Sequence, residues 1–122
     1  MVRGLLSELA SIDELRNQIL KDIRKLELRL NASDVQIEIE KHADANQKRN
    51  FIDERTDFSL IRVKLENTIL ERIAVRLKNL EPELKKGIEE LDQAIEDLKN
   101  TIGILEAIKG VTSIIARILV II

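Results

Sequence analysis

Apolar residues recur along this chain in alternating steps of three and four, and this spacing constrains the fold more than any other feature. Such steps place side chains on one face of an α-helix, in the arrangement by which coiled coils make their contacts. The clearest seam contains Leu84, Ile88, Leu91, Ile95, Leu98, Ile102 and Leu105, and another contains Leu5, Leu9, Ile12, Ile19, Ile23, Leu26 and Leu30. The sequence therefore predicts long helices that pack along their lengths.

Arg16 is the one residue out of place in the first of these seams. A long arginine side chain can reach past an apolar surface and keep its charged end in water. The alternative is a buried charge with a function. We favour the side chain that reaches water.

Few residues can break the helices, because the chain has one proline and four glycines. The segment 31–34 is predicted to end the first helix, and Ser33 followed by Gln36 has the spacing of a capping box. Pro82 suits the first turn of a third helix, since its missing N–H is not needed there. A bend or hairpin is expected before it, or a kink if the helix continues through it.

The middle of the chain is the hardest part to assign. A seam runs from Val35 to Leu77, but the stretch 40–50 has only Ala43 and Ala45 as apolar residues. It is either a solvated helix or an irregular loop, and we favour the helix. The alternation in 35–40 also fits a strand, which we rank lower. From residue 60 to residue 80 several faces are apolar, which predicts the best-buried part of the chain.

Together these signals predict an all-α fold, an elongated antiparallel bundle of three long helices with coiled-coil-like packing. The chain has the length of one domain, 1–122. We expect helices at about 3–31, about 34–80 and about 82–120. A break near 45–58 is the alternative for the second helix.

The C-terminal stretch 101–122 is strongly apolar, yet it does not resemble a membrane-spanning helix. Such a helix needs about twenty predominantly apolar residues, and this stretch contains Glu106, Lys109 and Arg117 on one polar stripe. The chain has no tryptophan or tyrosine to anchor a membrane interface. An amphipathic helix with a wide apolar face is therefore expected. A stripe of mostly small side chains, Gly103, Ala107, Gly110 and Ile114, would permit close helix approach.

A wide apolar face must be covered by the other helices or by another chain. We predict that this face contributes to self-association and that the protein is a homo-oligomer. The residues predicted to carry the contact are Ile104, Ile108, Val111, Ile115, Ile118 and Leu119.

The composition argues against most catalytic and metal sites. Charged residues make up 34% of the chain at a net charge of -2, there is no cysteine, and His42 is the only histidine. Cysteine zinc sites and the usual catalytic triads therefore cannot form in one chain. Glu38 and His42 are four residues apart, and Asp53 and Asp57 could join them from a neighbouring chain, but we favour a solvated histidine. We predict no catalytic, cofactor-binding or metal site and no cofactor.

Nucleic-acid binding is also not expected. Basic residues between 62 and 86 are diluted by acidic ones, and Phe51 and Phe58 are the only aromatic residues. We instead expect these cations to face the acidic stretch 89–97.

The sequence thus predicts a non-enzymatic helical-bundle protein that acts in protein–protein interaction, scaffolding or self-assembly, with a protein partner. Glu8 and Asp13 interrupt the N-terminal apolar residues, so no signal peptide is indicated and a cytoplasmic location is expected. The alternative is a membrane-active protein, peripheral to a membrane, that uses the apolar helix 101–122.

Overall fold

The computed structural model describes residues 2–120, with side chains from residue 8 onward, and it is built of helices. In order these are α1 (Val2–Leu30), α2 (Ser33–His42), α3 (Ala45–Asn67), α4 (Leu70–Glu96) and α5 (Thr101–Leu119). No strand occurs within residues 2–120. The predicted all-α fold is confirmed, and the strand considered for 35–40 is wrong because this segment lies in α2. In the part of the chain that the structure describes, five helices replace the three that were expected.

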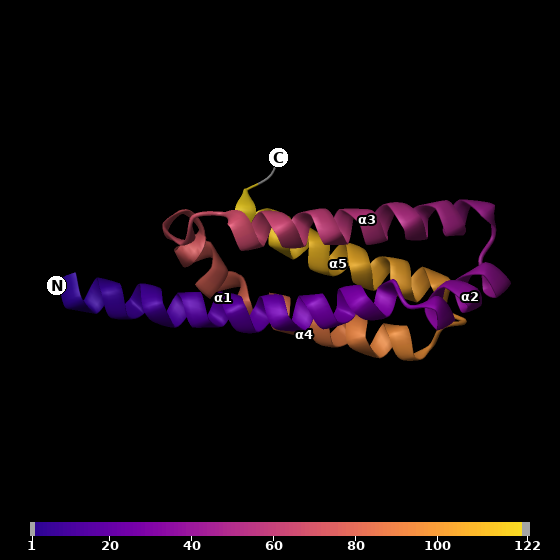
Figure 1. Cartoon of the computed structure of the whole chain (residues 1–122), viewed down its shortest axis with the longest axis horizontal. Helices are drawn as coiled ribbons and strands as arrows, with labels where there is room; N and C mark the ends of the chain where they lie inside the picture. The colour runs from indigo at the N-terminus through magenta and orange to yellow at the C-terminus, as the bar shows by residue number, and fades with distance from the viewer. Residues whose placement is uncertain (1, 121–122) are drawn as a thin grey trace.

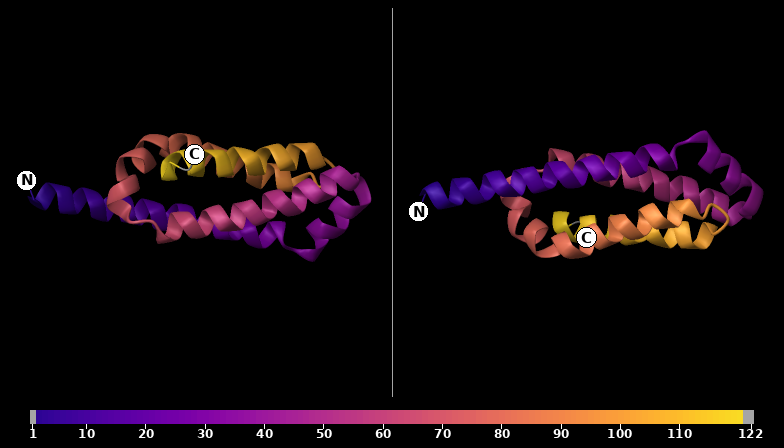
Figure 2. Two further views of the ribbon diagram at one scale, coloured as in Figure 1. Left: turned by 90° about the horizontal axis from the view of Figure 1, so that it is seen from above. Right: turned by 90° about the horizontal axis from the view of Figure 1, so that it is seen from below.

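The bundle is elongated, and its long axis is followed by α1, α3, α4 and α5 (Figure 1). α1 packs against α3 and α4, and α5 packs against the same two helices. The chain runs in opposite directions in α1 and α3, and again in α4 and α5 (Figures 1 and 2). The short helix α2 lies at one end, where the chain turns from α1 to α3, and the start of α1 projects past the other end. Because α3 and α4 each lie between α1 and α5, they occupy diagonally opposite corners.

The connection from α3 to α4 explains how consecutive helices reach opposite corners. Only Thr68 and Ile69 separate the two helices, and the first turns of α4 cross the end of the bundle before the helix changes direction (Figure 2). Pro82 lies inside α4, so the hairpin expected before it is wrong and the alternative of a continuing helix holds. Proline cannot donate a hydrogen bond to the carbonyl four residues earlier, at Lys78, which bends helices.

The third predicted helix, about 82–120, is wrong in its extent because the chain turns between α4 and α5. α5 begins after Asn100, whose side-chain Oδ1 accepts a hydrogen bond of 3.0 Å from the N–H of Gly103. The seam deduced from the sequence runs in register across this turn, since Leu98 lies within it and Ile102 follows it. An apolar register alone therefore does not reveal the break.

The second predicted helix, about 34–80, is wrong in its extent because it is broken twice. One break is the turn at Thr68 and Ile69, and the other is at a capping box that sequence reasoning did not identify. Asp44 accepts a hydrogen bond of 2.8 Å from the N–H of Gln47, and the Gln47 side chain accepts one of 3.0 Å from the N–H of Asp44. The box expected at Ser33 and Gln36 does not form, because α2 begins after Ala32 with no side-chain cap. The preference for one helix through 40–50 is therefore wrong.

The core is aliphatic apart from two aromatic side chains. Phe51 and Phe58 of α3 are fully buried. α4 and α5 approach closely at Gly87, where an added Cβ would stand 3.4 Å from the Cδ1 of Ile114. Gly110, by contrast, is exposed and its Cβ would meet nothing within 4 Å. Of the stripe of mostly small residues in α5, Ile114 therefore lies against α4, whereas Gly110 faces open space.

Candidate interaction surfaces

The residues predicted for self-association lie in the core of a single chain. Ile104, Ile108, Val111, Ile115 and Ile118 are fully buried, and Leu119 is half-buried. α3 and α4 pack against α5, so its wide apolar face is covered within the chain. Self-association through these residues stays a prediction, and it would require the bundle to open. Among the described helices, none is long and apolar enough to cross a bilayer.

The Arg16 side chain does not extend into water as expected. It is only 15% exposed, and its Nη1 donates a hydrogen bond of 2.7 Å to the main-chain carbonyl of Thr68. Its Nη2 lies 3.1 Å from the carboxylate of Asp13. Thr68 is the C-cap of α3, where carbonyls lack helical partners. Arg16 therefore holds α1 against the turn that leads into α4.

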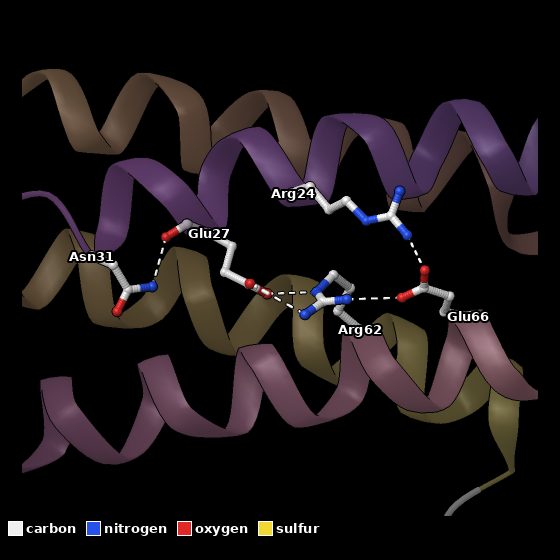
Figure 3. A network of polar contacts seen from close by, with 5 residues as sticks. All are labelled: Arg24, Glu27, Asn31, Arg62 and Glu66. Atoms are coloured by element: carbon white, nitrogen blue, oxygen red, sulfur yellow. Dashed lines mark hydrogen bonds and ion pairs between the residues drawn. The ribbon is translucent and has the colours of Figure 1, made fainter.

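A network of charged side chains joins α1 to α3 (Figure 3). Arg62 donates from Nε to Glu27 at 2.6 Å and from Nη1 to Glu66 at 2.8 Å. Glu66 also pairs with Arg24, and the Asn31 amide donates to the main-chain carbonyl of Glu27 at 2.7 Å. The hydrogen bond with Glu27 raises the pKa of Arg62 and outweighs the opposing effect of burial. Arg62 therefore keeps its charge, and its bonds link the two helices.

The basic residues of the middle segment do not face the acidic stretch 89–97 as expected. Arg76 donates from Nε to the main-chain carbonyl of Ile118 at 2.7 Å. Lys85 pairs with Glu81 of its own helix at 2.7 Å. Within the acidic stretch, Asp92 and Glu96 pair with Arg29 of α1. Among the described residues, none of the basic residues of the middle segment forms an ion pair with the acidic stretch.

His42 lies on an exposed part of α2, and its Nε2 is 3.2 Å from a carboxylate oxygen of Glu38. The shared helix face of this pair is as expected from the sequence. Within the described residues, no group of three or more His, Asp or Glu is placed to hold a metal ion. Asp53 and Asp57 lie on α3, on either side of Glu54 in the sequence.

Glu54 is a partly desolvated carboxylate between α3 and α5. Its side chain is 18% exposed, and Nζ of Lys109 lies 3.8 Å away. Burial raises the pKa of Glu54, an effect that Lys109 partly offsets and that nearby Asp57 and Asp53 reinforce. The carboxylate thus has an unfavourable environment when it is ionised.

Several of the exposed large aliphatic side chains lie at the two ends of the bundle. At the α2 end, a groove of about 700 Å³ is lined by Asp34, Ile37, Glu38, Glu96, Asp97, Leu98 and Lys99; we call it the acidic groove. At the opposite end, the first turns of α4 present Ile69, Arg72, Val75, Arg76 and Lys78; we call them the basic cap. Val75 is 72% exposed and Ile69 is 57% exposed.

These exposures correct the prediction that residues 60–80 are the best-buried part of the chain. Leu60, Val63, Ile69 and Val75 are all exposed, although Leu65, Ile73 and Leu77 belong to the core. The signal was present in the sequence, because a helix that is apolar on several faces has more apolar residues than one core can cover. The additional apolar residues, which are predicted to lie in the core, lie at the surface.

We compared the chain with protein-family models, with curated proteins and with solved structures, and none of the three comparisons gives a match. Evidence about its function therefore comes from its own surfaces and contacts.

Proposed function

We propose that this protein is a non-enzymatic helical-bundle scaffold that acts through protein–protein interaction and self-assembly. One observation carries the proposal: aliphatic side chains are exposed at both ends of the elongated bundle, with Val75 the most open of those at the basic cap. Apolar surface that the core does not need, bordered by charged residues, is typical of sites that bind another protein.

The polar contacts of the chain support a scaffold because they tie helices together. Arg16 joins α1 to the α3–α4 turn, Arg62 joins α1 to α3, and Arg76 joins α4 to the end of α5. Each of these guanidinium groups bonds a specific acceptor on another helix. A bundle fastened in this way presents its two ends at a fixed separation, as a scaffold requires.

Two further features belong to the same proposal. Coiled-coil-like packing is supported by the buried residues of α5, whose steps of four and three persist from Ile104 to Ile118. A cytoplasmic location is supported by the absence of cysteine from the sequence.

Sedimentation velocity over a wide concentration range tests the proposal. The sedimentation coefficient of the full chain is expected to rise with concentration as copies associate. Leu28→Ser serves as the control, because Leu28 is exposed on α1 outside both the groove and the cap, and it should leave the rise unchanged. A full chain that remains monomeric at every concentration would contradict self-assembly.

The membrane alternative requires α5 to leave the bundle, since its apolar face is buried. Co-sedimentation with vesicles of phosphatidylcholine, and with vesicles that also contain phosphatidylserine, tests it directly. We expect the protein to stay in the supernatant with both. Binding to either vesicle would favour the membrane function over the scaffold.

A further inference from the structure

We infer that copies of this chain associate head to tail, with the basic cap of one copy in the acidic groove of the next. The inference rests on the proposed function, because it specifies the contact by which self-assembly would occur. It follows from the charge, exposure and placement of the two ends.

The acidic groove carries an excess of negative charge around an apolar floor. Its lining has four carboxylates and one ammonium group, with Ile37 and Leu98 as its apolar residues. Glu96 pairs with Arg29, and Glu38 pairs with Lys41 and His42. Among the described residues, no ion pair engages Asp34 or Asp97, so these two carboxylates are free to meet a cation.

Ile37 shows that the groove also has apolar surface to bury. This side chain is 51% exposed, and it borders the groove from α2. An occupant of the groove would therefore need both a cation and an aliphatic side chain.

The basic cap provides both groups. Arg72, Arg76 and Lys78 outnumber the single carboxylate of this stretch, Glu71. Lys78 pairs with Glu8 of α1 at 3.4 Å. Arg72 is exposed, and its guanidinium forms no ion pair among the described residues. Arg72 precedes Val75 by three residues, so the two side chains share one face of α4. That face presents an unpaired cation beside the most exposed aliphatic side chain of the cap.

The placement of the two ends makes a second copy the occupant. The groove lies at the α2 end and the cap at the α3–α4 turn, at opposite ends of the long axis (Figures 1 and 2). One chain therefore cannot bring its own cap to its own groove. Two caps or two grooves would bring like charges together, which opposes those pairings.

A contact between two different surfaces of the same chain is heterologous. When such a contact does not close into a ring, it repeats and produces an open row of copies. Apolar residues at the centre with charges around them, here Val75 against Ile37 and Leu98, form the usual arrangement of a protein interface. We therefore expect linear oligomers whose length grows with concentration.

Charge reversal at either end tests this contact. Arg72→Glu removes the positive charge of the cap, which then has two cations and two carboxylates, and Asp97→Lys weakens the negative charge of the groove while the cap stays basic. Each variant alone is expected to associate with a Kd at least about tenfold higher than that of the unaltered chain, because the attraction between the cap and the groove is then weaker. Circular dichroism checks that both remain helical.

An equimolar mixture of the two variants is the decisive sample. The altered cap of the first then meets the altered groove of the second, and the remaining contact joins an unaltered cap to an unaltered groove. We expect the mixture to recover the sedimentation behaviour of the unaltered chain. Lys21→Glu and Glu90→Lys, which are exposed on the sides of α1 and α4, change the net charge equally and should leave association intact.

The outcomes separate this inference from the proposed function. If the unaltered chain associates and the end variants associate equally well, self-assembly stands and the head-to-tail contact is overturned. If both variants fail to associate and their mixture also fails, the contact is overturned as well. If the unaltered chain never associates, both the contact and the self-assembly proposal are wrong.

Discussion

The guanidinium of Arg16 donates a hydrogen bond of 2.7 Å to the main-chain carbonyl of Thr68, which lies 52 residues later in the chain. Thr68 ends α3, and its carbonyl is one of those that an α-helix leaves without an internal partner. Two residues later α4 begins its diagonal crossing. The arginine that interrupts the first apolar seam thus secures the turn on which the topology of the bundle depends.

Arg16→Met is expected to lower the free energy of unfolding by about 1–3 kcal/mol. Methionine keeps a long apolar stem, but it removes a charged donor and leaves a partly buried carbonyl without a partner. Urea unfolding measures the loss. Arg29→Met is the matched control, because Arg29 pairs with Asp92 and Glu96 at a more exposed site and should cost less than about 1 kcal/mol. Equal losses in the two variants would show that the hydrogen bond to Thr68 stabilises the fold no more than the exposed ion pairs of Arg29 do.

Helical seams were predictable from the sequence because they depend on local spacing. The partners of those helices were not, since they depend on contacts between distant residues. Arg16 stands out in the sequence because it interrupts an apolar seam. The acceptor of its hydrogen bond, however, is a main-chain atom of a turn that lies near Arg16 only in the folded chain. Likewise, a register that continues through Leu98 cannot reveal that the chain reverses there.

Capping motifs show the same limit at short range. Ser33–Gln36 and Asp44–Gln47 have the same spacing, yet only the second forms a capping box. The two helix starts lie in different tertiary surroundings. The motif spacing alone therefore does not predict which of the two forms the hydrogen bonds of a capping box.

Asp44→Ala should therefore lower the free energy of unfolding by about 0.5–2 kcal/mol, the usual cost of losing an N-cap. Ser33→Ala is the matched control and should change it by less than about 0.5 kcal/mol, since Ser33 makes no cap bond. Urea unfolding of both variants under identical conditions makes the comparison. A larger loss for Ser33→Ala than for Asp44→Ala would reverse the assignment of the two motifs.

The pair formed by Glu27 and Arg62 should show measurable coupling. Both side chains are mostly buried, and Arg62 Nε lies 2.6 Å from the Glu27 carboxylate. A double-mutant cycle with Glu27→Gln and Arg62→Met is expected to give a coupling energy of about 0.5–3 kcal/mol, as found for contacting residues in one network. The exposed pair of Glu8 and Lys78, at 3.4 Å, should give no measurable coupling in the same experiment. Equal coupling in both pairs would mean that burial does not strengthen the network.

Gly110→Ala is expected to raise the free energy of unfolding by about 0.5–1 kcal/mol. Glycine inside a helix is costly in backbone entropy, and an added Cβ at this site meets nothing within 4 Å. Gly103→Ala is the control with the same chemical change, but its Cβ would stand 2.5 Å from Nδ2 of the capping Asn100. Displacing that cap should cancel the gain. Thermal unfolding of the two variants distinguishes them, and an equal gain at both sites would show that the Asn100 cap adds no stability.

The titration of Glu54 should lower the free energy of unfolding as the pH rises. Its pKa in the folded chain lies above the ordinary value of 4.5, chiefly because of burial. The folded state therefore binds the proton more tightly than the unfolded state does, so stability declines from about pH 4.5 through the raised pKa. Glu54→Gln removes this titration, so its stability relative to the unaltered chain should be greater at about pH 7 than at about pH 3. Lys109→Met removes the partner that lowers the pKa of Glu54 and should make the decline steeper. Urea unfolding at a series of pH values measures all three chains, and a difference between Glu54→Gln and the unaltered chain that stays constant with pH would contradict the raised pKa.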